Sequence, residues 1–219
     1  MLESNENQEE ASSPWKSTCD RFAELLATPL ENMPPDPLNA QKRRSAVSAL
    51  SIALSTDEFF ELYISGIKAL EHSDKEECKQ LYTFLKDHPE DFEASIDGDL
   101  VDKVQDYAVN LLSEGNSAAA LPYLGAILFL RQDSGDLWFK LALALYELER
   151  YPLAERAALT AARLLPQQPE SSLFLGLCEK EIGHEDDMIR AREQAEELIK
   201  LNNIQLSPEW SELYESLKQ

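Results

Sequence analysis

The chain has 219 residues, and its 41 acidic and 20 basic side chains give a formal net charge of -21 at pH 7. Such a surface repels phosphate backbones and anionic headgroups, so it disfavours nucleic-acid and membrane-surface partners and favours basic or amphipathic proteins; the acidity equally fits a solvated exterior. Three widely spaced cysteines, no signal-peptide pattern and no run of about 18 apolar residues predict a cytoplasmic protein without membrane insertion.

Residues 1–40 are predicted to form an acidic arm with one short amphipathic helix and a proline-rich linker. The first 14 residues are acidic and poor in apolar side chains, which is typical of disorder. Trp15, Phe22 and Leu26 fall at helical spacing before the proline-dense segment 29–37. These three side chains either pack on the body of the protein or form the contact of a homodimer.

Residues 41–100 are predicted to contain N-terminal helices at 44–54, 56–71 and 74–87. Each range carries apolar residues at helical spacing. The last two helices together have the length of one helical repeat but lack its small residues, so a degenerate repeat is one interpretation of them.

Residues 101–202 contain three copies of one pattern at a spacing of 34 residues. A small residue recurs at Ala108, Ala142 and Gly176, and a turn is expected near residues 115, 149 and 183. This period, with small residues where two helices approach, is the signature of the tetratricopeptide helix–turn–helix unit. Residues 203–219 are predicted to form a C-terminal capping helix that starts at Ser207 and Pro208. The predicted fold is therefore all-α: a tetratricopeptide-repeat helical array, or α-solenoid, with N-terminal helices and a C-terminal capping helix.

Stacked repeats of this kind line a concave groove with positions 2, 5, 9 and 12 of each first helix. The groove residues predicted here are Gln105, Val109, Leu112, Asp136, Phe139, Leu143, Tyr146, Leu173 and Leu177. An apolar strip bordered by acids suits an extended, partly apolar peptide with basic or polar flanks. Gln105 and Val109 replace the Lys and Asn of a carboxylate clamp, which disfavours that binding mode. An alternative is that the N-terminal helices of the protein itself cover part of this surface.

Catalytic, metal-binding and cofactor-binding motifs are absent from the sequence. The three histidines lie in different elements, and His184 is read as a solvated turn residue. The acidic run 185–187 beside it lacks the ligand spacing and glycine of a calcium loop. No glycine-rich phosphate loop, nucleophile elbow or zinc-protease motif occurs. The sequence therefore favours a binding protein over an enzyme, without cofactor.

Several local phrases resemble the class II (LcrH/SycD-type) chaperones of bacterial type III secretion systems (T3SS). They are Val104-x-x-Tyr107-Ala108 in repeat one, the junction 164–169, and Phe174-x-Gly176-x-Cys178 with Gly183 and segment 195–199 in repeat three. The resemblance implies a bacterial, cytoplasmic protein, often dimeric through N-terminal helices, that keeps a hydrophobic translocator secretion-competent. It also implies that the groove grips a P-x-L-x-x-P-like segment of this client, although the family's repeat one is rich in aromatic groove residues where this chain has Gln105, Val109 and Leu112. A generic tetratricopeptide scaffold or adaptor of a secretion or regulatory assembly is the alternative function.

Overall fold

The computed structural model describes residues 56–87 and 96–218, and every regular element in these two ranges is a helix. The helices are α4 (Thr56–His72), α5 (Glu76–Asp87), α6 (Gly98–Ser113), α7 (Ser117–Leu130), α8 (Gly135–Glu147), α9 (Tyr151–Leu164), α10 (Pro169–Ile182), α11 (Glu185–Asn202) and α12 (Pro208–Ser216). The predicted all-α helical array is confirmed. The predicted arm, the linker and the helices at 15–28 and 44–54 lie outside the described residues, and so do Trp15, Phe22 and Leu26.

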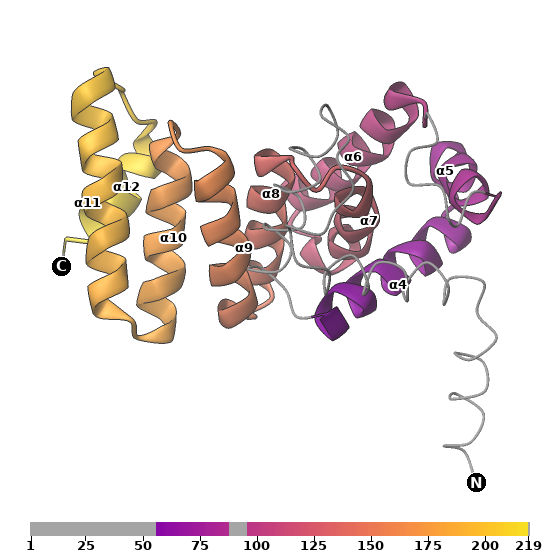
Figure 1. Ribbon diagram of the computed structural model, residues 1–219, viewed down its shortest axis with the longest axis horizontal. Coiled ribbons are helices and arrows are strands. Elements are labelled where there is room, and N and C mark those ends of the chain that lie inside the picture. The colour runs from indigo at the N-terminus through magenta and orange to yellow at the C-terminus, as the bar shows by residue number, and fades with distance from the viewer. Residues whose placement is uncertain (1–55, 88–95, 219) are drawn as a thin grey trace, which may run out of the picture.

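The array consists of the antiparallel helix pairs α6–α7, α8–α9 and α10–α11. Adjacent pairs stack through contacts of α7 with α8 and of α9 with α10. In Figure 1 the row runs from α4 and α5 on the right to α10, α11 and α12 on the left. Ala108, Ala142 and Ala154 are fully buried at their repeat positions, where each lets two helices approach closely.

The turn within each pair has the same backbone geometry at a spacing of 34 residues. Gly115, Glu149 and Gly183 all adopt positive φ angles, of 74°, 59° and 80°. At each turn this residue and the next one donate their N–H groups back to the end of the first helix, as Gly115 does to Leu112 O and Asn116 to Leu111 O. This is the Schellman arrangement, which satisfies carbonyls that the helix leaves unpaired.

We expect Glu149→Gly to raise the free energy of unfolding by about 0.5–1 kcal/mol, because a side chain in the left-handed region is strained while glycine is not. Glu149 is exposed, so its side chain contributes little packing. Chemical denaturation measures the change. The reverse substitution at the matched position, Gly115→Ala, should destabilise the protein although a Cβ atom there meets nothing within 4 Å. Equal stabilities for all three proteins would contradict the strain at residue 149.

Helix α7 lies at the centre of the N-terminal half and is apolar on all sides. Its sequence SAAALPYLGAILFL shows no polar stripe, and most of its residues are buried. Three neighbours account for this burial: α6, α8 and α4. A helix that is apolar all round must be covered all round.

Helix α4 provides the outer cover of α7 and crosses it at two glycines. A Cβ atom on Gly66 would lie 2.6 Å from Pro122 O, and one on Gly125 would lie 2.5 Å from Leu62 Cγ. The Arg156 guanidinium also binds the Glu58 carboxylate at 2.7 Å, which ties α4 to α9. Because α4 lies along α7 and its contacts with α5 are fewer, these two helices form a side layer rather than a further stacked pair.

Helix α12 lies within the range predicted for the capping helix, but it packs mainly on α10 rather than on α11. Ser207 occupies the N-cap position and Pro208 the first turn, as predicted, although the Ser207 side chain makes no capping hydrogen bond. The place of α12 therefore affects the first helices of the repeats, which carry the predicted groove.

Candidate functional site

The nine predicted groove residues, called the groove face below, lie on α6, α8 and α10. Asp136 is exposed and Leu173 is fully buried, while the other seven side chains are half-buried. Six of these half-buried side chains are apolar: Val109, Leu112, Phe139, Leu143, Tyr146 and Leu177. A partner with an apolar segment could cover them, and the burial of that surface would favour its binding.

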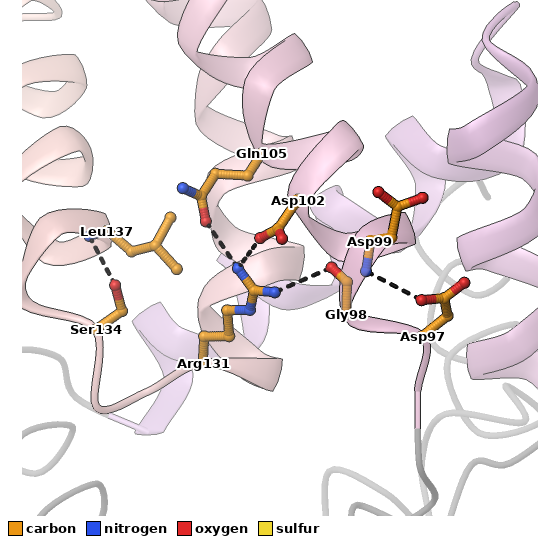
Figure 2. Close-up of polar contacts among 8 residues, drawn as sticks. All are labelled: Asp97, Gly98, Asp99, Asp102, Gln105, Arg131, Ser134 and Leu137. Carbon is orange, nitrogen blue, oxygen red and sulfur yellow. Dashed lines mark hydrogen bonds and ion pairs between the residues drawn. The ribbon is translucent and has the colours of Figure 1, made fainter.

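Arg131 organises the end of the groove face that lies near the start of α6. One guanidinium nitrogen, Nη1, donates to Asp102 Oδ1 at 2.5 Å and to Gln105 Oε1 at 3.4 Å, while Nη2 donates to Gly98 O at 3.2 Å. Figure 2 shows the guanidinium lying between these three acceptors. The network fixes the Gln105 amide and neutralises one acid beside it. The sequence pattern did not identify Arg131, because this residue follows α7 and lies outside the groove positions.

The start of α8, close to this network, is fixed by its own cap and by one buried ring. Ser134 Oγ accepts from Leu137 N at 3.4 Å, as Figure 2 shows. Trp138 is fully buried, and its Nε1 donates to Gln132 O at 2.9 Å. These contacts hold α8 in the orientation in which Phe139 and Leu143 belong to the groove face.

An aromatic cluster occupies the middle of the groove face. The Phe139 ring lies 5.4 Å from Phe174, and Tyr146 lies 5.5 Å from Phe174 and 5.2 Å from Tyr151, all in edge-on arrangements. Such pairs contribute about 0.5–1.5 kcal/mol beyond area burial. Tyr146 Oη donates to Glu181 Oε1 at 3.2 Å. Burial, together with the Glu181 charge, raises the pKa of Tyr146 to about 12, so this phenol is a hydrogen-bond donor at neutral pH.

Helix α12 covers the part of the groove face that belongs to α10. Leu173 is buried in a cluster with Ala195 and Leu217. The Trp210 ring lies 6.0 Å from the Phe139 ring. Within the described residues, this C-terminal helix rather than an N-terminal one covers predicted groove residues.

One group of side chains near the turn of the third pair has the composition of a cation site. Ligand atoms of Glu179, His184 and Asp187 lie within 4.8 Å of one another, and one imidazole with two carboxylates suits a divalent transition metal. However, His184 Nδ1 already pairs with Glu179 Oε2 at 3.1 Å, and Asp187 pairs with Arg190. We therefore assign this group to holding the turn between α10 and α11.

Glu155 on α9 lies in the electrostatic environment of this group. Burial raises its pKa, and the negative charge of Glu179 raises it further. A carboxyl whose pKa is higher in the folded protein than in the unfolded chain loses folding free energy as it ionises. This cost is absent below the unfolded pKa and complete above the folded one.

We therefore expect Glu155→Gln to stabilise the protein at pH 7.5 and to have little effect near pH 3.5, because the wild-type carboxyl is protonated there in both states. Urea denaturation at the two pH values measures this difference. Glu193→Gln, at an exposed glutamate of α11, is the control for simple loss of surface charge. A stabilisation equal for both variants, or independent of pH, would contradict the role of burial at Glu155.

A pocket of about 230 Å³ lies between α5 and α6, away from the groove face. It is lined by two lysines, two acids and uncharged residues: Lys75, Glu77, Cys78, Lys103, Val104, Asp106, Tyr107 and Asn110. Lys103 is paired with Asp99 at 2.7 Å, and the Lys75 ammonium lies 5.4 Å from the Tyr107 ring centroid. Its charges are mixed, so they select no ligand class.

Two cysteines of the described residues are free and buried. Burial raises the pKa of Cys78, and it raises the pKa of Cys178 to about 12. Both thiols are therefore protonated at neutral pH and are poor nucleophiles. Among the helices in residues 56–87 and 96–218, none combines the length and the apolar character needed to cross a membrane.

Comparison with known proteins gives similarity in structure but not in sequence. No protein-family model matches the chain, and no curated protein matches it. A chain in the crystal structure of a T3SS complex from Aeromonas hydrophila is similar, with a TM-score of 0.51 and 17% identity over 64% of this chain and 91% of that chain. A chain of the CopN-Scc3 complex aligns with a TM-score of 0.48 and 18% identity, over 71% of this chain and 96% of that one. The first similarity shows that the helical array is a fold also found in a T3SS complex, which agrees at the level of fold with the resemblance noted in the sequence.

Proposed function

We propose that this protein is a cytoplasmic T3SS chaperone that binds an apolar segment of a secreted translocator along its groove face. The observation that carries this proposal is the row of half-buried apolar side chains across α6, α8 and α10, in a chain with a net charge of -21. The fold shared with a chain of a T3SS complex supports the assignment to secretion. The protein acts by binding, without a cofactor or a catalytic step.

The physical reason for this pairing of surfaces is solubility. A translocator that later enters a membrane carries apolar segments that aggregate in water. Covering one such segment with the groove face removes its apolar surface from water, and the charged exterior of the complex opposes association with further copies. The acids at the edges, including Asp136 and Glu181, favour a client whose apolar segment has basic flanks.

Co-expression with candidate clients tests the proposal. An apolar secreted protein that is insoluble alone should become soluble and protease-resistant when this chain is present. Matched cultures that express the client with the groove variant described in the Discussion serve as the control. If capture from native cells yields only soluble components of an assembly and no apolar secreted protein, the chaperone function is wrong and an adaptor function takes its place.

A further inference from the structure

The C-terminal helix α12 occupies the groove face with a small set of apolar side chains. Trp210 contacts Phe139 on α8, and Leu217, directly after the helix, is buried with Leu173 on α10. Leu217 also lies close to the α10 backbone, because a Cβ atom on Gly176 would be 3.3 Å from its Cδ1 atom. Two of the nine groove-face residues are thus engaged by one segment of the same chain.

Two cations hold the C-terminal end of α12 in place. Lys180 Nζ donates to Ser216 O at 2.9 Å, and Arg192 Nη1 donates to Leu217 O at 3.1 Å. Carbonyls at a helix C-terminus lack partners within the helix, so these bonds from α10 and α11 satisfy them. The contact therefore has a defined orientation as well as an apolar surface.

Helix α12 has little stability of its own. It is nine residues long, none of those residues is buried, and the Ser207 side chain gives it no capping hydrogen bond. A helix this short is not stable in water without tertiary contacts. Segments with few buried contacts open at a lower free energy than the whole protein. The α12 contacts can therefore open while the array stays folded.

Charge favours replacement of α12 by a basic segment. The helix carries Glu209, Glu212 and Glu215, all exposed, in a chain whose net charge is already -21. The rest of the molecule repels these glutamates, whereas the same field attracts a client with basic flanks.

We propose that α12 is an exchangeable occupant of the groove face, and that a client segment of similar chemistry replaces it on α8 and α10. The arrangement of Trp210, Leu213 and Leu217 defines this chemistry as a short amphipathic helix with one aromatic anchor followed by leucines at helical spacing. The inference rests on the proposed function for the identity of the client, but the exchange itself is testable without one.

Hydrogen exchange of the full chain provides the first test. Amides of residues 208–217 should exchange roughly 100-fold faster than those of α10, because α12 opens locally. Trp210→Glu should remove their protection while α10 and α11 keep theirs, and Glu212→Ala, on the exposed side of the same helix, should change nothing. Lys180→Ala is a milder variant that should speed exchange of α12 about 5- to 10-fold by removing one charged hydrogen bond. Exchange of α12 as slow as that of α10 in the wild-type chain would overturn the proposal.

A labelled peptide of residues 205–218 provides the second test. Fluorescence anisotropy should show it binding to the full-length Trp210→Glu variant at least about 10-fold more tightly than to the wild-type chain, where α12 occupies the site. Equal binding to the two chains, or no binding to either, would show that the surface does not accept an exchanging segment.

A client obtained by co-expression then links the two proposals. Its binding should abolish the exchange protection of α12 in the wild-type chain. If the client binds while α12 stays protected, the exchange proposal fails and the chaperone function stands. If exchange occurs but no apolar client is found, the chaperone function fails and the exchangeable site remains.

Discussion

Replacing Gly66 with alanine is expected to lower the free energy of unfolding by about 1–3 kcal/mol, because the new methyl group has no room. A glycine-to-alanine change inside a helix ordinarily stabilises it by about 1 kcal/mol. At Gly66 a Cβ atom would lie 2.6 Å from Pro122 O and 2.9 Å from both Ala126 N and Ala126 Cβ. These are atoms of the α7 backbone or directly attached to it, so no side-chain rotation can relieve the overlap.

The position of α7 explains why the backbone cannot yield. This helix is enclosed by α4, α6 and α8, so a shift away from α4 would push it into the first two stacked pairs. Only separation of α4 from α7 relieves the overlap, and it would expose apolar residues of both helices. The loss of this packing is the source of the expected destabilisation.

Gly98→Ala is the matched control for Gly66→Ala. It places the same methyl group on a helix, at the first residue of α6, where nothing lies within 4 Å. Its stability should equal or slightly exceed that of the wild type in urea denaturation. If Gly66→Ala is as stable as Gly98→Ala, then α4 does not cross α7 at this glycine.

The repeat architecture could be predicted because its information is periodic. Residues 115, 149 and 183 were placed in turns by their spacing alone, and all three have the left-handed backbone conformation. Glu149 shows that the period carries more information than residue type, since glutamate is not a turn former of this kind. Small residues at fixed offsets likewise identified the close helix contacts, and Ala142 and Ala154 are fully buried.

The cover of α7 by α4 could not be predicted, although part of its signal was present. The segment 117–130 lacks a polar face, which indicates that a further element covers it. Nothing in the sequence identifies that element, because the contact depends on two glycines, Gly66 and Gly125, that are 59 positions apart and belong to no repeat. Contacts between elements without a shared period leave no such pattern.

The groove face illustrates the same limit for the candidate site. The repeat register assigned its nine residues to three first helices, but register cannot tell which of these side chains the chain itself covers. Leu173 is buried and Phe139 is in contact with Trp210, since α12 folds back onto α10. Arg131 was missed because it acts from the segment after α7. The residues that remain half-buried and away from α12 therefore give the sharper test of function.

Combining Val109→Lys with Leu143→Lys is expected to weaken client binding at least about 100-fold, which corresponds to about 2.7 kcal/mol. Both side chains are half-buried members of the groove face, on α6 and α8. A client that covers them would bury two ammonium groups without partners, which is costly in an apolar contact. The new charges also repel basic flanks of the client.

Phe139 is a poorer choice for this test, because its ring supports Phe174 and Trp210 and a charge there would disturb the fold and α12 together. Asn110→Lys is the control, since Asn110 follows Val109 on the same helix but is exposed. It adds the same charge without placing it under the client, so binding should remain within about threefold of wild type. Titration calorimetry with a co-purified client measures both affinities, and circular dichroism checks that helicity is unchanged. If the double variant and Asn110→Lys bind equally well, the client lies elsewhere on the molecule, because an unpartnered charge cannot be neutral inside an apolar contact.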